Sequence, residues 1–194
     1  MSRIIPIILI LIVIVASIAG IWSIGQSIFG GGAPAPTEVV NRGVENLTKT
    51  ESGSGVRMTV RGPIVGNEEH NSYTITVKPN YRNMTTYKGY NKKPIQRKEL
   101  SNNKKAYTEL VHALDRLGYM DDLPFIDSAN DTRGICATGT LYEFEVLKDN
   151  KSVQKLWTAS CTRGSFNAKL TLVRELFLDQ IPDNYKLLGK IDVS

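Results

Sequence analysis

The sequence predicts an α+β domain behind an N-terminal transmembrane helix, and three patterns indicate this fold class. Residues 4–24 are apolar and uncharged, a run long enough for a helix to cross the roughly 30 Å hydrocarbon core of a bilayer. Apolar and polar residues then alternate with the period of two that strands show, at residues 56–61 and 73–77, and a helical stripe follows at residues 106–117. We expect the order ββαββα or close to it, with an antiparallel sheet and two helices.

The apolar N-terminus, residues 1–29, is interpreted as a transmembrane anchor with its helix at about residues 4–28. Arg3 is the only charged side chain before the run, and the next charge on the other flank is Glu38. This asymmetry predicts a single-pass protein of the cell membrane with its N-terminus in the cytoplasm and its C-terminal domain outside. A cleavable signal peptide is the alternative, because residues 17–19 place small side chains where a signal peptidase cuts.

Residues 30–55 are predicted to form a flexible linker. GGGAPAP at Gly30–Pro36 favours neither helix nor strand, because glycine is conformationally free and proline lacks a donor. Thr37 could cap a short helix, and TESGSG at Thr50–Gly55 is a second flexible break. The extracytoplasmic α+β domain is therefore expected at residues 56–194.

The first half of this domain is predicted to be an antiparallel meander followed by a helix. Strands are expected at residues 56–61, 73–77 and 82–87, where every second residue is apolar in the first two. The apolar stripe at residues 106–117 predicts a helix that Ser101 or Asn102 caps and Gly118 ends. That helix should cover one face of the sheet.

The second half is predicted to be a hairpin and a last helix. Residues 136–147 and 153–162 should pair around the turn at residues 148–151, and Ser165 should cap a helix that Pro182 ends. Cys136 and Cys161 are the only cysteines, and neither has the spacing of a zinc site. In an exported domain, they predict one structural disulfide, and we expect no metal and no cofactor.

A basic segment is the strongest candidate for a binding site. Seven cations surround a single acid, Glu99, with three tyrosines close by; the cations are Lys88, Lys92, Lys93, Arg97, Lys98, Lys104 and Lys105. Such a cluster attracts anions. An anionic envelope polymer, lipid headgroups, incoming DNA or a protein partner would be accessible outside the cytoplasm, whereas cytoplasmic nucleic acid would not. A solvated loop explains the same residues without function.

Two other groups of residues are candidates for sites. The loop at residues 121–131 is acidic and contains Asp121, Asp122, Asp127 and Asp131. These carboxylates could serve an envelope hydrolase or a weak calcium site, but they are also typical of turns. His70 and His112 lie 42 residues apart and are expected to be separate surface histidines.

Several stretches of the domain form a familiar set: VRMTVRGPIV at 56–65, TTYKGY at 85–90, DTRGICATG at 131–139, LYEFEVL at 141–147, KLWTASC at 155–161 and QIPD at 180–183. Together they resemble uncharacterised single-pass envelope proteins of bacteria with small genomes. That resemblance implies an anchored domain and supplies no catalytic residue. The helix followed by a bridged hairpin also loosely resembles small secreted subtilisin inhibitors, although no reactive-site segment matches.

These observations favour a membrane-anchored extracytoplasmic binding domain that is not an enzyme. Its ligand would be an envelope component or another protein, bound through the basic segment. The alternatives are an envelope hydrolase that uses the acidic loop and a secreted domain of the protease-inhibitor kind.

Overall fold

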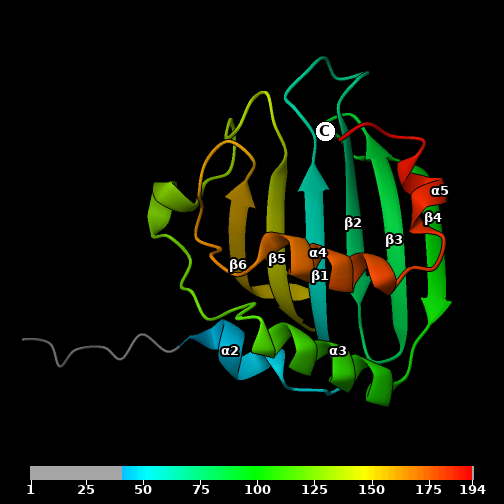
Figure 1. The fold of residues 1–194 in the computed structure, drawn as a ribbon, viewed down its shortest axis with the longest axis vertical. Helices are drawn as coiled ribbons and strands as arrows, with labels where there is room; N and C mark the ends of the chain where they lie inside the picture. The colour runs from blue at the N-terminus through cyan, green and yellow to red at the C-terminus, as the bar shows by residue number, and fades with distance from the viewer. Residues whose placement is uncertain (1–40, 194) are drawn as a thin grey trace, which may run out of the picture. The chain divides into compact units, whose positions relative to one another are not determined.

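The computed structural model describes residues 41–193, and these fold into a six-stranded sheet with helices packed against it (Figure 1). The elements along the chain are α2 (Arg42–Leu47), β1 (Ser54–Arg61), β2 (Asn71–Val77), β3 (Tyr81–Lys88), β4 (Lys93–Ser101), α3 (Lys104–Arg116), the 3₁₀ helix η1 (Asp127–Asn130), β5 (Leu141–Lys148), β6 (Lys151–Ala159), α4 (Leu170–Asp179) and α5 (Asn184–Leu188).

The sheet is antiparallel throughout and has the order β4-β3-β2-β1-β5-β6. The first four strands form a meander. The chain then leaves the sheet through α3 and a long loop and returns to place β5 beside β1. This return makes β1 a central strand. Its alternating residues therefore point to the middle of each face of the sheet.

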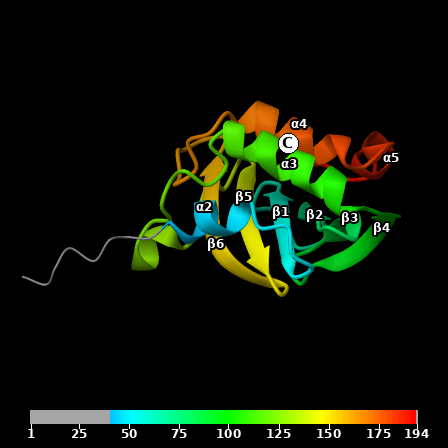
Figure 2. The same cartoon turned by 90° about the horizontal axis from the view of Figure 1, so that it is seen from below.

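One face of the sheet carries the hydrophobic core. Met58 of β1 is fully buried and lies opposite Ile75 of β2 and Phe144 of β5. Helices α3 and α4 cover this face (Figure 2) and add their own apolar stripes, which are Tyr107, Leu110, Val111 and Leu114 from α3 and Val173 and Phe177 from α4. The predicted α+β class and the alternation along β1 and β2 are confirmed here, because period-two strands must bury one face.

The predicted fold class is wrong in its elements and is corrected here. Four strands, not two or three, precede α3, and two helices rather than one follow β6. Strand β4 was missed because its sequence, KPIQRKELS, is polar and contains Pro94. Such a composition is unfavourable in a central strand but suits an exposed edge, where charges and proline prevent pairing with other chains.

The transmembrane part of the predicted fold class is not supported. No helix within residues 41–193 has the length and the apolar character that crossing a bilayer requires. The predicted span at residues 4–28 and the anchor at residues 1–29 lie outside the described residues. The fold class that the structure supports is therefore an α+β domain with a six-stranded antiparallel sheet and few helices.

Residues 41–55, which the sequence analysis placed in a flexible linker, belong to the folded unit. Asn41 caps α2 by accepting hydrogen bonds from the backbone N–H groups of Gly43 and Val44. The Gly43 N–H also donates to Oε1 of Gln154 in β6 at 2.9 Å, and Leu47 is fully buried. These long-range contacts fix α2 on the core, and they could not be inferred from the local Gly and Ser content.

The predicted second hairpin is confirmed, although its first strand, β5, begins at Leu141 and not at Cys136. Asp149 and Asn150 connect β5 to β6 with φ values of 50° and 67°. Positive φ at both central residues is the type I′ geometry, which matches the twist of the paired strands, and Asp and Asn tolerate it better than most residues do.

The fully buried Tyr119 makes the free energy of unfolding decrease at alkaline pH. Its hydroxyl oxygen lies 3.1 Å from the Arg57 carbonyl oxygen and 3.2 Å from the Glu145 carbonyl oxygen, and the two carbonyls share its single proton. Burial raises the pKa of Tyr119 well above its usual range. The folded state thus keeps the proton when the unfolded chain loses it, so stability is fully present below the unfolded pKa of about 10 and declines as the pH rises above it.

We therefore expect the free energy of unfolding to fall between pH 9 and pH 11 by as much as about 1.4 kcal/mol per pH unit for this group. Urea titrations at both pH values test this. Tyr119→Phe should cost about 1 kcal/mol at pH 8, because one buried hydrogen bond is lost, and the stability of this variant should decline less steeply at high pH. An equally steep decline in both proteins would show that Tyr119 is not responsible.

Candidate functional site

The face of the sheet opposite the core is polar and forms the candidate site. Arg57, Thr59 and Arg61 alternate with the core residues of β1 and therefore point to this face. The strands on either side continue the pattern, since Thr59 lies opposite Thr74 of β2 and Glu143 of β5. We call this surface the polar face.

The polar face encloses a cavity of about 420 Å³, which we call cavity A. Its volume falls within the roughly 300–1,000 Å³ of small-ligand pockets. Side chains from five strands and the β3–β4 turn line it: Arg57, Thr59, Arg61, Thr74, Thr76, Asn83, Tyr87, Lys92, Glu143, Glu145 and Lys155. Every one of these side chains carries a hydrogen-bonding group, so cavity A suits a polar or charged ligand.

Three salt bridges organise the charges of cavity A. Arg57 pairs with Glu145 at 3.3 Å, while Glu143 pairs with both Arg61 at 2.7 Å and Lys155 at 3.2 Å. The Glu143 side chain is only 5% exposed. A carboxylate at that depth needs several partners, because its lost hydration must be replaced by charge and hydrogen bonds.

Cavity A keeps an excess of positive charge. Four cations line it against two carboxylates, and Lys92 forms no salt bridge within residues 41–193. Although Lys92 lies at the surface, neighbouring atoms displace water from its ammonium group. This desolvation, followed by the charge of Arg61, lowers the pKa of Lys92. An anion in cavity A would stabilise the charged ammonium.

Local backbone geometry places Lys92 in the turn between β3 and β4. Lys92 has a φ of 53°, and its N–H donates to the Gly89 carbonyl at 3.0 Å. Gly89 itself has a φ of 71°, which only glycine adopts freely, and its N–H donates to His70. The turn is therefore tied to the start of β2, at the end of cavity A.

Arg61 has an unused donor at the edge of cavity A. Its Nη2 atom pairs with Glu143, but its buried Nε has no hydrogen-bond partner in the described part of the chain. A buried N–H without an acceptor is costly and rare in folded proteins. The Nε–H group is thus a donor that a ligand could satisfy.

The structure separates most of the predicted basic segment. Lys88 and Lys93 lie opposite each other at one end of the β3–β4 pair, near Lys92, whereas Lys104 and Lys105 begin α3 beyond the other end. Arg97 pairs with Glu99, and Lys98 contacts Asp183 at 3.6 Å. Among the seven predicted residues, only Lys92 lines cavity A.

The acidic loop has structural roles in the described part of the chain. Asp122 accepts hydrogen bonds from the backbone N–H of Asn167 at 3.0 Å and from its side chain at 2.9 Å. Asp131 pairs with Arg133, whose hydrogen bonds lower the pKa of Asp131 to about 2. Residues 41–193 contain no cluster of three or more His, Cys, Asp and Glu that could hold a metal ion.

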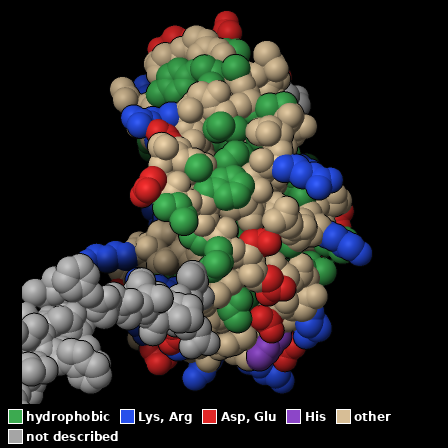
Figure 3. All heavy atoms as spheres, turned by 90° about the vertical axis from the view of Figure 1, so that its left-hand side faces the viewer, with side chains coloured by type: hydrophobic (Ala, Val, Ile, Leu, Met, Phe, Trp, Pro, Cys, Tyr) green, Lys and Arg blue, Asp and Glu red, His purple; other side chains and the backbone are tan. Residues whose placement is uncertain are grey.

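The same loop presents apolar side chains that the sequence analysis did not single out. Leu123 and Phe125 are about two-fifths exposed, and Ile126 is 80% exposed. Phe125 packs edge-to-face on Trp157 of β6 at 5.9 Å. Figure 3 views this side of the molecule and shows apolar side chains at the surface.

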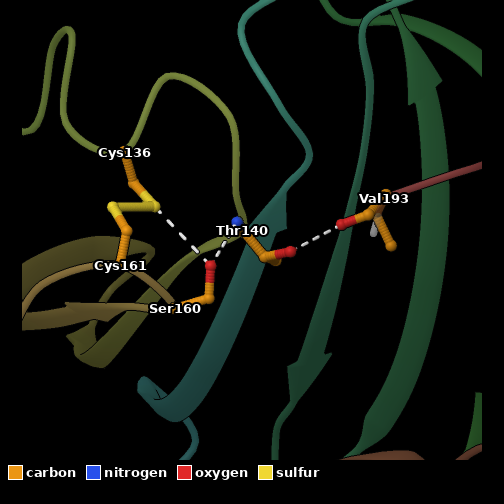
Figure 4. Close-up of a disulfide and its surroundings, with 5 residues drawn as sticks. All are labelled: Cys136, Thr140, Ser160, Cys161 and Val193. Carbon is orange, nitrogen blue, oxygen red and sulfur yellow. Dashed lines mark hydrogen bonds between the residues drawn. A yellow bond between two sulfur atoms is a disulfide. The ribbon is translucent and has the colours of Figure 1, made fainter.

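The predicted disulfide is present and joins the chain just before β5 to the chain just after β6. Cys136 and Cys161 are bonded with their Cα atoms 5.7 Å apart. Ser160 supports this end of the hairpin by accepting a 2.9 Å hydrogen bond from the Thr140 N–H, and the Thr140 hydroxyl donates to Val193 at 2.7 Å (Figure 4). The hairpin end and the C-terminal segment are thereby connected.

Five charged residues of cavity A escaped the sequence analysis, namely Arg57, Arg61, Glu143, Glu145 and Lys155. A signal was present, because the two arginines are separated by four positions and the two glutamates by two, so each pair must share a face of its strand. What the sequence did not show is that β1 and β5 are neighbours, which brings opposite charges together.

No protein-family model matches the chain, and no curated protein sequence matches it significantly.

Proposed function

We propose that this domain is a binding module that holds an anionic group of its ligand in cavity A. The observation that carries this proposal is the excess of two positive charges in a polar, partly enclosed concavity. A carboxylate or phosphate would neutralise that excess, whereas a cation would meet repulsion.

The residues of cavity A offer suitable donors for such an anion. The guanidinium groups of Arg57 and Arg61 are held in place by their glutamates, so little conformational entropy is lost when they bind. Lys92 supplies an ammonium group that has no salt-bridge partner among the described residues, and threonine hydroxyls of β1 and β2 can donate as well. Charge-assisted hydrogen bonds of this kind are roughly twice as strong as neutral ones.

We also propose that the domain works outside the cytoplasm, in contact with the cell envelope. The disulfide supports this location, because such bonds persist in oxidising compartments and are rare in the cytosol. Anionic envelope polymers or the acidic groups of a protein partner are then the candidate ligands. Cytoplasmic nucleic acid is not an expected partner.

The test compares two neighbouring lysines. Lys92 lines cavity A, whereas Lys93 begins β4, is exposed and does not line it. Inorganic phosphate and acetate serve as probes in an NMR titration of the full chain, with chloride as the control for ionic strength. We expect Lys92→Glu to weaken phosphate binding at least tenfold, because the substitution reverses the unpaired charge, and Lys93→Glu to change it by less than threefold.

Equal effects of the two substitutions would show that general surface attraction, rather than cavity A, binds the anion. Absence of any saturable shift at residues of cavity A in the wild-type protein would overturn the proposal directly. Both variants change the net charge by the same amount, so non-specific electrostatics cannot account for a difference between them.

A further inference from the structure

A second cavity lies beside cavity A and is apolar. This cavity B has a volume of about 340 Å³, and its wall is shared between the β1–β2 loop, the β3–β4 turn and the loop before the disulfide. Its lining residues are Arg61, Gly62, Ile64, His70, Tyr90, Thr132, Arg133, Gly134, Ile135 and Leu141. Aliphatic and aromatic side chains supply most of this surface, in contrast to cavity A.

His70 and Tyr90 form a rigid aromatic wall of cavity B. Their rings stack at 4.3 Å with an angle of 11° between the planes. The Tyr90 hydroxyl donates to the Val65 carbonyl at 2.7 Å, and Nδ1 of His70 lies 3.0 Å from the carbonyl oxygen of Pro63. His70 was expected at the surface but is only 6% exposed. The wall is therefore fixed by the β1–β2 loop.

Cavity B is closed from the other side by the disulfide loop. The backbone N–H of Ile64 donates to the Ala137 carbonyl at 2.7 Å, next to Cys136. The apolar character continues outward, since Ile64 and Tyr90 are each almost half exposed. The cavity is thus preformed and has an apolar rim, which are properties of a small-ligand site.

Cavities A and B share one boundary. Arg61 lines both. Thr132 lines cavity B and donates from its hydroxyl to Glu143, which lines cavity A, at 3.2 Å. The Nε of Arg61, which has no hydrogen-bond partner within residues 41–193, belongs to this same boundary. A polar and an apolar cavity therefore meet at one arginine residue.

We propose that cavities A and B form one site for a small amphiphilic anion, whose phosphate or carboxylate lies in cavity A and whose hydrocarbon part lies in cavity B. This inference rests on the proposed function, because it assumes that cavity A binds the anionic group. Arg61 contacts the ligand where its anionic group joins its hydrocarbon part. Two complementary properties of the domain favour this occupant, namely the positive excess of cavity A and the apolar lining of cavity B.

Three soluble probes test the arrangement: inorganic phosphate, hexyl phosphate and hexanol. Each methylene group that becomes buried improves affinity by about fourfold, so burying two of them gives more than tenfold. We expect hexyl phosphate, at concentrations below micelle formation, to bind the full chain at least tenfold more tightly than inorganic phosphate. Hexanol should bind far more weakly than hexyl phosphate, because it lacks the charge that cavity A recognises.

Two neighbouring apolar residues give the matched variants. Ile64 lines cavity B and Val65 does not, although the two are similarly exposed. Ile64→Ser should reduce the advantage of the hexyl chain to less than threefold and leave the binding of inorganic phosphate unchanged. Val65→Ser should change neither the advantage of the hexyl chain nor the binding of inorganic phosphate. Because these side chains are already exposed in large part, neither substitution removes core packing.

The outcomes separate this inference from the proposed function. Equal affinity for hexyl phosphate and inorganic phosphate, or an advantage that survives Ile64→Ser, would overturn the combined site while anion binding in cavity A stands. Hexanol binding as tightly as hexyl phosphate would overturn it too, since cavity B would then act alone. Phosphate binding that does not respond to Lys92→Glu would instead remove the proposed function.

Discussion

Phe144→Ala is expected to lower the free energy of unfolding by about 3–5 kcal/mol, the range for removing a fully buried phenylalanine. Phe144 lies in β5 between Met58 of β1 and Leu156 of β6 and is 0% exposed. Its ring stacks on Phe166 at 4.1 Å and meets Tyr119 edge-to-face at 5.8 Å. The substitution therefore leaves a cavity between the sheet and the segments packed on it.

Urea denaturation followed by circular dichroism measures this loss. Phe125→Ala is the control, because Phe125 is 42% exposed and makes a single aromatic contact, with Trp157. Its loss should cost about 1 kcal/mol. Similar costs for the two substitutions would contradict the assignment of Phe144 to the centre of the core. A domain of this size has a total stability of about 5–15 kcal/mol, so Phe144→Ala removes a large part of it.

The elements that the sequence predicted well are those whose period is unambiguous. Val56, Met58 and Val60 alternate with polar residues, and the stripe through Leu110 and Leu114 has helical spacing. Burial against a single core selects these patterns directly, so they can be read without knowledge of the neighbours. The hairpin turn at residues 149–150 is predictable for the same reason, because its geometry is local.

Strand β4 and the start of α4 could not be predicted because long-range contacts decide both. Apolar and polar residues alternate poorly along β4, and its pairing with β3 is what makes it a strand. Ser165, the expected cap of the last helix, is buried and accepts a hydrogen bond from the Trp157 N–H at 3.2 Å. That contact holds the segment against β6, and α4 begins only at Leu170.

At the candidate site, too, the local pattern is predictable from the sequence and the long-range contacts are not. Counting charges along the chain identified Lys92 but grouped it with lysines that the fold places elsewhere, such as Lys104 at the start of α3. The other charged side chains of cavity A come from β1, β5 and β6, and β1 is far from the other two strands in sequence. Only the return of the chain to the centre of the sheet brings Arg61 and Glu143 within 2.7 Å.

Replacing both cysteines, Cys136→Ser with Cys161→Ser, is expected to lower the free energy of unfolding by about 3.5 kcal/mol. The bond closes a loop between residues 25 positions apart, and in the chain-entropy account a loop of this length restricts the unfolded chain by about that amount. The folded state should change little. The hydrogen bond from Thr140 to Ser160 and the one from Thr140 to Val193 do not involve sulfur and remain to hold the hairpin end.

The reductant dependence of unfolding distinguishes this effect from damage to the folded state. Wild-type protein in urea with a thiol reductant should show the stability of the double variant, because reduction removes the same constraint and Cys161 is exposed to the reagent. The double variant itself should not respond to the reductant. If the reductant destabilises both proteins equally, the bond is not the cause. If the oxidised wild type and the double variant are equally stable, the loop of the β5–β6 hairpin is already restricted in the unfolded chain, and the entropic argument is wrong for this protein.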